Sequence, residues 1–215
     1  SGISELTEVS FTMRQLEPKN WNAEWENNYS PVVINENCVI RAHFHNICPE
    51  IQHDIVITPK MSFGTGHHET TSLMMNRMFA LDFNRKSVLD LGSGTGVLSI
   101  LASKIGAGDI VAVDCNEWAF KNSKENAQLN HITDIQFLHG DINTVKNERF
   151  DIILANINRN SILDSLDIYV EIMNDSADIL LSGFLEQDNN LILKNAQRLG
   201  LELVVLQNKN IWQKI

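Results

Sequence analysis

The sequence has few cysteines, and they are not grouped. Cys38, Cys48 and Cys115 lie far apart among the 215 residues and show no C-x-x-C spacing. Neither a zinc site nor a disulfide framework is therefore predicted, and no metal site is expected. Reduced thiols in a cytoplasmic protein are the simpler interpretation.

Long apolar runs and a signal-like start are also missing. No stretch of about 18 consecutive apolar residues occurs, so no membrane span is expected. Residues 1–4 lack the basic and apolar regions of a secretory signal peptide. Internal repeats and low-complexity tracts are absent as well. We expect a cytoplasmic protein without a membrane partner.

Positive charge is scarce. The chain has 17 Lys and Arg against 27 Asp and Glu, which gives a formal net charge of −10. A broad phosphate-binding face is therefore disfavoured, and direct nucleic-acid binding is not expected. The acidic balance is compatible with a basic partner. The length suffices for one α/β domain with an appendage.

One stretch organises the rest of the chain. Residues 88–91 predict a short buried strand, residues 97–104 a helix, and residues 110–113 a second strand that ends in Asp114. Glycines without a Cβ let a ligand approach the backbone closely, and Asp114 is placed to accept hydrogen bonds from two ribose hydroxyls. The turn between the first strand and the helix holds three glycines at alternate positions: Gly92, Gly94 and Gly96.

The glycine spacing separates two classes of ligand. Dinucleotide enzymes use G-x-G-x-x-G, whereas Gly96 stands one position too early for that pattern. G-x-G-x-G preceded by Asp90 resembles motif I of the S-adenosylmethionine-dependent methyltransferases. A tight turn without any ligand is the alternative, and Asp90 together with Asp114 disfavours it.

The remaining pattern predicts a doubly wound α/β fold. We expect a mostly parallel seven-stranded sheet with a terminal antiparallel strand, Rossmann-like as in class I methyltransferases, preceded by a short N-terminal α+β extension. Residues 1–58 are predicted as the extension and linker, and residues 59–215 as the methyltransferase domain. Further strands are expected at 5–16, 31–34, 38–41, 55–57, 135–138, 150–155, 177–181, 201–206 and 209–214. Further helices are expected at 21–27, 70–80, 118–129, 162–173 and 185–199.

Polar residues follow the third and fourth strands. Asp141 follows the third strand, and an acid at this position commonly lies near the adenine amino group of the ligand in such folds. The alternative is that Asp141 is a loop residue that faces solvent. Asn156 and Asn158 stand at the carboxyl edge of the sheet, where open α/β folds bind ligands. Asn156 is positioned to fix the methionine end of the cofactor or to orient an incoming amine.

A second glycine turn precedes motif I, in residues 63–66. We predict that residues 63–71 form a lid over the ligand, with Phe63 and a threonine hydroxyl reaching it. A plain loop that caps the following helix is the alternative. The neighbouring histidines His67 and His68 point apart in such a loop, so they are not expected to bind a metal.

The order of these motifs is similar to the ribosomal protein L11 methyltransferase family. The resemblance rests on Trp21, Trp25, Pro31, Phe63-Gly-Thr-Gly66, Thr70-Thr71, Asp90-Leu-Gly-Ser-Gly-Thr-Gly96, Asp114 and Ala155-Asn-Ile157. It implies methyl transfer from S-adenosylmethionine to amines of a large-subunit ribosomal protein, with cofactor contacts from Thr71, Gly92, Asp114 and Asn156. We add Phe63, Asp90, Gly94 and Asp141 to the predicted cofactor site, and Asn156 is the predicted catalytic residue.

Family members carry an N-terminal domain that grips the ribosomal protein. Little of such a domain fits before Trp21, so residues 1–58 are expected to be a remnant of it or a replacement for it. We therefore expect normal cofactor binding and weak substrate capture from this chain.

Three other functions compete with this interpretation. A nucleic-acid base or a small molecule could be the methyl acceptor, although the prolines and the aromatic residue typical of adenine-amino methyltransferases are missing after Asn156. A nicotinamide oxidoreductase is disfavoured by the glycine spacing. A non-catalytic S-adenosylmethionine-binding module is disfavoured by the intact Gly92, Asp114 and Asn156.

Overall fold

The computed structural model describes residues 29–58, 60, 62–209 and 212–214. The residues from Pro31 to Ile215 cluster into one compact unit. Two predictions, the strand at 5–16 and the helix at 21–27 with its Trp21–Trp25 stripe, lie outside the described residues.

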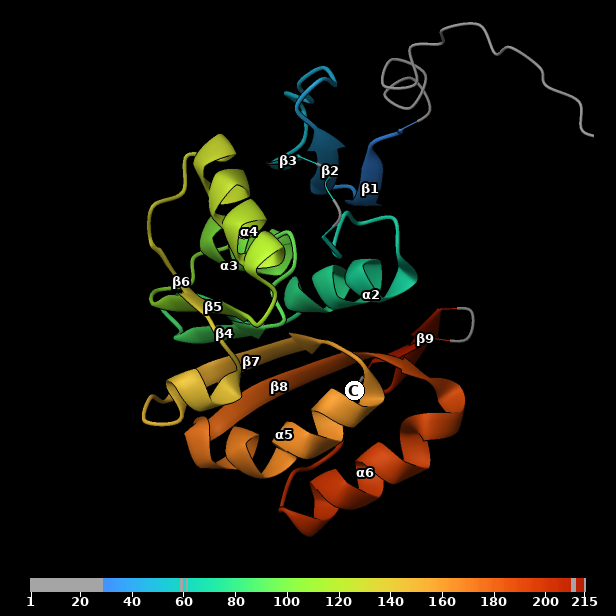
Figure 1. Cartoon of the computed structure of the whole chain (residues 1–215). Coiled ribbons are helices and arrows are strands. Elements are labelled where there is room, and N and C mark those ends of the chain that lie inside the picture. The colour runs from blue at the N-terminus through green and yellow to red at the C-terminus, as the bar shows by residue number, and fades with distance from the viewer. Residues whose placement is uncertain (1–28, 59, 61, 210–211, 215) are drawn as a thin grey trace, which may run out of the picture. The chain divides into compact units, whose positions relative to one another are not determined.

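A seven-stranded sheet forms the frame of this unit (Figure 1). Five consecutive strands, starting at one edge of the sheet, pair in parallel, and β10 pairs antiparallel with both β8 and β9. The predicted mostly parallel sheet with a terminal antiparallel strand is therefore confirmed. In spatial order the strands are β6 (Ile135–His139), β5 (Ile110–Asp114), β4 (Val88–Leu91), β7 (Phe150–Asn156), β8 (Met173–Leu185), β10 (Trp212–Lys214) and β9 (Gln207–Lys209).

The strand order reverses between β4 and β7. From β4 the chain first adds β5 and β6 on one side, and it then returns to add β7 and β8 on the other. The loops that leave β4 and β7 therefore diverge at the carboxyl edge of the sheet, which is where open α/β folds bind ligands. Both predicted ligand segments, the glycine turn and Asn156, lie at this edge.

Helices cover both faces of the sheet (Figure 1). Successive side chains of a strand point to opposite faces, so Val88 belongs to one hydrophobic core and Leu89 to the other. None of the described helices is long and apolar enough to cross a membrane. The helices are α2 (Glu69–Met78), α3 (Val97–Lys104) and α4 (Glu117–Leu129) on one face, α5 (Arg159–Ile172) and α6 (Asn189–Arg198) on the other, and the 3-10 turns η1 (Ile142–Val145) and η2 (Glu186–Asp188).

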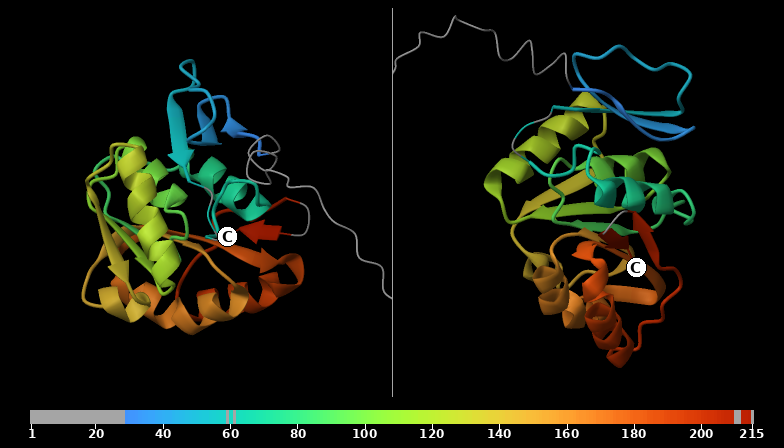
Figure 2. Two further views of the ribbon diagram at one scale, coloured as in Figure 1. Left: turned by 45° about the horizontal axis from the view of Figure 1, so that its top comes forward. Right: turned by 90° about the vertical axis from the view of Figure 1, so that its right-hand side faces the viewer.

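A small sheet precedes α2 in the chain and contains β1 (Val32–Asn35), β2 (Cys38–Ala42) and β3 (His53–Ile57). β1 and β2 form the predicted hairpin, and β2 pairs in parallel with β3. The right-hand view of Figure 2 shows this sheet beyond the helices α2 to α4. Ile40 and Ile55 share a hydrophobic core with Met74 of α2. Residues on both sides of the predicted boundary at residue 58 therefore pack into the same core. A substrate-recognition role for residues 1–58 stays a prediction.

The C-terminal elements depart from the prediction in two places. Residues 201–206 form no strand, because the partner strand β10 pairs only with residues 207–209. The helix expected from residue 185 begins at Asn189 instead, since β8 continues to Leu185 and pairs there with Trp212. Gly200 ends this helix with a φ of 87°, as the sequence predicts.

Candidate functional site

The glycine turn between β4 and α3 has a backbone that favours glycine. Gly92, Gly94 and Gly96 have φ values of 73°, 58° and 77°. A Cβ on Gly92 would lie 2.3 Å from Cγ2 of Ile157, and one on Gly94 would lie 2.2 Å from the carbonyl oxygen of Phe63. Larger residues are therefore excluded both by conformation and by space. The turn is held close to the segments that contain Phe63 and Ile157.

Asp114 joins the end of β5 to this turn. Its Oδ2 accepts a hydrogen bond from the backbone N–H of Gly94 at 2.8 Å, and its Oδ1 accepts one from that of Asn116 at 2.8 Å. A carboxylate has about four lone-pair sites, so two acceptor sites remain for other donors. The arrangement fits the predicted hydrogen bonds to ribose hydroxyls.

Asp90 contacts helix α3. Its Oδ2 accepts hydrogen bonds from the backbone N–H of Ser99 at 3.1 Å and from the Ser99 hydroxyl at 2.5 Å. The side chain is buried, and desolvation raises the pKa of its carboxyl from 3.8 to about 6. These contacts hold the start of α3 against β4. A direct contact between Asp90 and the cofactor stays a prediction.

Asn156 ends β7 and meets Thr71 in the first turn of α2. Its Nδ2 donates to Oγ1 of Thr71 at 3.3 Å, while its Oδ1 is buried without a hydrogen-bond partner. An unpaired buried acceptor costs about 1–3 kcal/mol, so a ligand that supplies a donor is favoured here. The two predicted residues are brought together, although 85 positions separate them.

A cavity of about 310 Å³ lies beside the turn and is large enough for part of a nucleoside cofactor. Gly92, Cys115, Asp141, Ile142 and Ile157 contribute to its lining. Asp141 also caps the 3-10 turn η1, because its Oδ1 accepts from the backbone N–H of Asn143 at 2.9 Å. Of the predicted site residues, Gly92 and Asp141 line this cavity, whereas Asp114 and Asn156 do not, although their chain neighbours Cys115 and Ile157 do.

The predicted lid is attached to the glycine turn. The carbonyl oxygen of Phe63 accepts from the backbone N–H of Thr95 at 2.8 Å, and that of Gly64 accepts from the Thr95 hydroxyl at 2.6 Å. The Phe63 side chain is half exposed. His68 caps α2 by accepting from the backbone N–H of Thr70 at 3.3 Å, which supports the capping alternative. Motion of a lid stays a prediction.

A cluster of metal-binding side chains does not occur in the described parts of the chain. No group of three or more His, Cys, Asp and Glu side chains is arranged there to hold a metal ion. His67 lies in the loop before α2, and His43 lies in the loop after β2.

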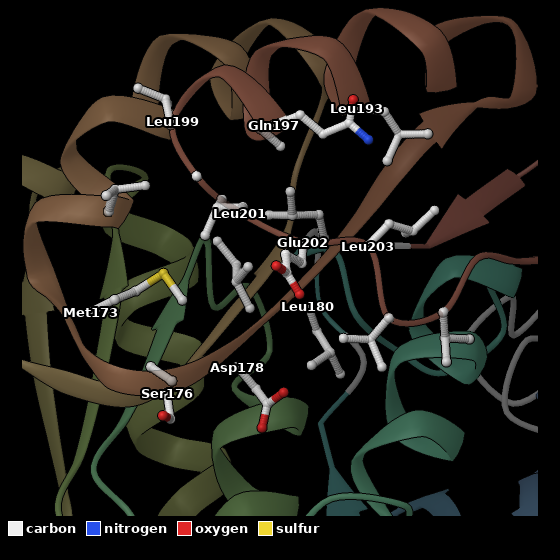
Figure 3. Close-up of a pocket in the computed structure, with 18 of the residues that line it drawn as sticks. Met173, Ser176, Asp178, Leu180, Leu193, Gln197, Leu199, Leu201, Glu202 and Leu203 are labelled. Carbon is white, nitrogen blue, oxygen red and sulfur yellow. The ribbon is translucent and has the colours of Figure 1, made fainter.

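A larger cavity of about 510 Å³ contains none of the predicted site residues. Figure 3 shows leucines around it, including Leu180, Leu201 and Leu203. It lies between β8 and residues 199–205, the segment that was expected to form a strand and does not. We attribute the cavity to that missing strand pairing and do not place the site there.

Sequence reasoning missed two buried polar residues of the site. Thr95 lies in the glycine turn and Asn126 lies on α4, and both have no exposed surface. The Asn126 amide donates to the carbonyl oxygen of Thr95 at 2.9 Å. The four-residue spacing of Asn122, Asn126 and Asn130 along α4 was the available signal, because it places three amides on one helical face.

The fold and this site together define a class I methyltransferase. A crystal structure of a ribosomal protein L11 methylase from Lactobacillus delbrueckii subsp. bulgaricus superposes with a TM-score of 0.82 at 25% identity, covering 86% of this chain and 96% of that one. The model of the family described as ribosomal protein L11 methyltransferase (PrmA) matches residues 2–215. The chain belongs to this family.

Relatives from other bacteria agree with this assignment. A ribosomal protein L11 methyltransferase from Phocaeicola vulgatus is 44% identical over 211 residues, which are 97% of this chain and 75% of the relative. One from Porphyromonas gingivalis is 44% identical over 195 residues, or 90% of this chain and 67% of the relative. The family resemblance inferred from the motifs is thus confirmed.

Proposed function

We propose that this methyltransferase transfers methyl groups from S-adenosylmethionine to amines of ribosomal protein L11, on lysine side chains, the N-terminus or both. The observation that carries the proposal is the unpaired Oδ1 of Asn156 beside a glycine turn and a carboxylate suited to a nucleoside. Family membership supplies the substrate. A cytoplasmic location is part of the same proposal, since ribosomal proteins are made there.

The cofactor supplies an electrophilic methyl group on a sulfonium centre. The residues of this chain that we expect to hold it are Gly92, Gly94, Asp114, Asp141 and Phe63. Asp114 and the turn bind the nucleoside part, because the carboxylate has free acceptor sites and the glycines allow close approach. Such binding fixes the direction from which an acceptor must arrive.

Asn156 orients the acceptor amine. A lysine amine has a reference pKa of about 10.4 and must lose a proton before its lone pair can attack. In this scheme an N–H of the neutral amine would donate to the Asn156 Oδ1, which would orient the lone pair of the amine. Thr71 holds the Asn156 amide in place through the bond to Nδ2. In this scheme the chain contributes orientation and desolvation, and no side chain becomes covalently modified.

The chain's charge supports a basic protein as the partner. Its formal net charge is −10, which favours encounter with a cationic substrate over binding to a phosphate backbone. Residues 1–58 remain our proposed site for part of the substrate contact.

Labelled S-adenosylmethionine tests the proposal directly. The chain is incubated with purified L11, with the other large-subunit ribosomal proteins, and with ribosomal and transfer RNA, and mass spectrometry locates the label. We expect label on L11 amines, and a much lower rate of labelling when Asn156→Ala replaces the wild type. Label in RNA, or equal labelling of other ribosomal proteins, would contradict the assignment.

A further inference from the structure

Three asparagines on one face of α4 bind the backbone of the segment that leads from β3 toward the glycine turn. Asn130 accepts from the backbone N–H of Val56 at 2.9 Å and donates to its carbonyl at 2.6 Å. Asn126 accepts from the backbone N–H of Thr58 at 2.8 Å, and Asn122 donates to the Thr58 carbonyl at 3.4 Å. The helix thus provides the hydrogen-bond partners that a neighbouring strand would otherwise supply.

Asn126 differs from Asn130 in what its second group touches. Its Oδ1 holds Thr58, whereas its Nδ2 donates to the carbonyl of Thr95 inside the glycine turn. Asn130 accepts from the backbone N–H of Val56 and donates to the carbonyl oxygens of Val56 and Asn126, so none of these bonds reaches the turn. Asn126 is therefore a direct link between the segment after β3 and the turn, and it has no exposed surface.

Thr95 carries this link to the cofactor site. Its backbone N–H and hydroxyl bind the carbonyls of Phe63 and Gly64, while its neighbour Gly94 donates to Asp114. The same Phe63 carbonyl fills the space where a Gly94 Cβ would stand. Thr58, Phe63, Gly64 and the turn therefore share one hydrogen-bond network, in which a displacement of one part leaves polar groups of the other unpaired.

We propose that Asn126 is a positioning residue that couples the position of Thr58 to the conformation of the glycine turn, and hence to cofactor affinity. The inference rests on the proposed use of S-adenosylmethionine. Coupling between two sites is reciprocal. Cofactor binding therefore stabilises the segment at Thr58, and displacement of that segment weakens cofactor binding by the same factor.

Matched substitutions on α4 test the coupling. Asn126→Asp keeps an oxygen for the Thr58 N–H but replaces the donor to Thr95 with a carboxylate oxygen that repels its carbonyl. Asn130→Asp makes the same chemical change one helical turn away, where the lost donor bonds run to the carbonyls of Val56 and Asn126 and none runs to the turn. We expect the Kd for S-adenosylhomocysteine, measured by calorimetry, to rise about tenfold or more in Asn126→Asp, the effect of losing one buried hydrogen bond and adding a repulsion. In Asn130→Asp it should stay within about twofold.

Steady-state kinetics separate positioning from general damage. Asn126→Asp should raise KM for S-adenosylmethionine while kcat at saturating cofactor and KM for L11 change little. A fall in kcat shared with Asn130→Asp would indicate a structural role and overturn the proposal. So would equal Kd values in the two variants.

A measurement on the wild type keeps the test decisive if Asn126→Asp does not fold. We expect S-adenosylhomocysteine to slow hydrogen exchange of the Thr58 amide at least about fivefold, because the amide held by Asn126 opens together with the turn. The Val56 amide, held by Asn130, should be little affected. Unchanged exchange at Thr58 with the ligand bound would overturn the coupling alone, whereas failure of the wild type to bind the ligand would also contradict the proposed function.

Discussion

The side-chain amide of Asn156 donates to the hydroxyl oxygen of Thr71 at 3.3 Å, and this bond joins the end of β7 to the first turn of α2. The bond fixes which way the amide faces, and the Asn156 Oδ1 is left buried without a hydrogen-bond partner. The orientation of the amide that we propose to be catalytic thus depends on Thr71 of α2.

Substitutions of this pair should have graded effects on methyl transfer. We expect Asn156→Ala to lower kcat by roughly 100-fold, since the acceptor amine is no longer oriented. Thr71→Val removes one hydrogen bond and should lower kcat about 3- to 10-fold. Radiolabel transfer to L11 measures both. In the double variant the Thr71 change should add little, because its effect passes through Asn156.

Asp114→Ala should weaken binding of S-adenosylhomocysteine by about 1.5–3 kcal/mol, the usual contribution of hydrogen bonds to a charged group. Calorimetry measures the affinity, and NAD serves as a ligand that should not bind. Asp114 also accepts from Gly94 and Asn116, so thermal unfolding must be recorded as well. An unchanged affinity would remove Asp114 from the site.

Gly94→Ala should both destabilise the fold and abolish cofactor binding. The new Cβ would stand 2.2 Å from the Phe63 carbonyl oxygen, so the turn or the neighbouring loop must move. Gly200→Ala is the matched control, because Gly200 also has a positive φ but nothing within 4 Å of its Cβ position. The control should cost about 1–2 kcal/mol of stability and leave the Kd for S-adenosylhomocysteine unchanged.

The buried Asp90 predicts a pH dependence of stability. Its folded-state pKa is raised from 3.8 to about 6, so between these values the folded protein binds more protons than the unfolded chain. The contribution of Asp90 to stability is therefore largest below pH 4 and is lost as the pH rises through 6. Relative to Asp90→Asn, the wild type should lose up to about 3 kcal/mol between pH 4 and pH 7, measured by urea unfolding. A constant difference across this range would mean that the pKa is not raised.

The segment 63–71 should exchange its amide hydrogens faster without cofactor than with it, as expected for a lid. Phe63 and Gly64 of this segment accept hydrogen bonds from Thr95 in this structure. Mass spectrometry of hydrogen exchange with and without S-adenosylhomocysteine checks this. Equal protection in both states would leave a structural loop that caps α2.

The sequence predicts the central fold well, because its strands are short apolar runs separated by clear turns. The glycine turn, Asp114 and Asn156 were predictable from their positions at strand ends, where parallel strands bring them to one edge. Residues 201–206 have a strand-like composition, but whether they pair depends on where β10 lies. The pattern of apolar residues within 201–206 does not indicate where β10 lies.

The link through Asn126 could not be predicted for a different reason. Its partners are backbone groups of Thr58 and Thr95, which lie 68 and 31 positions away. Almost every residue has the same backbone N–H and carbonyl groups. The sequence therefore does not indicate which residues bind the Asn126 side chain. The spacing of the asparagines on α4 indicates a buried polar face but not what it contacts.

The shared core of the small and large sheets has a consequence for the nascent chain. Ile40 and Ile55 pack into the same hydrophobic cluster as Leu180 of β8. During synthesis the first two leave the ribosome long before the third, so the cluster cannot close until most of the chain has emerged. The early strands therefore expose apolar surface during synthesis, and such exposed surface favours aggregation unless a chaperone covers it.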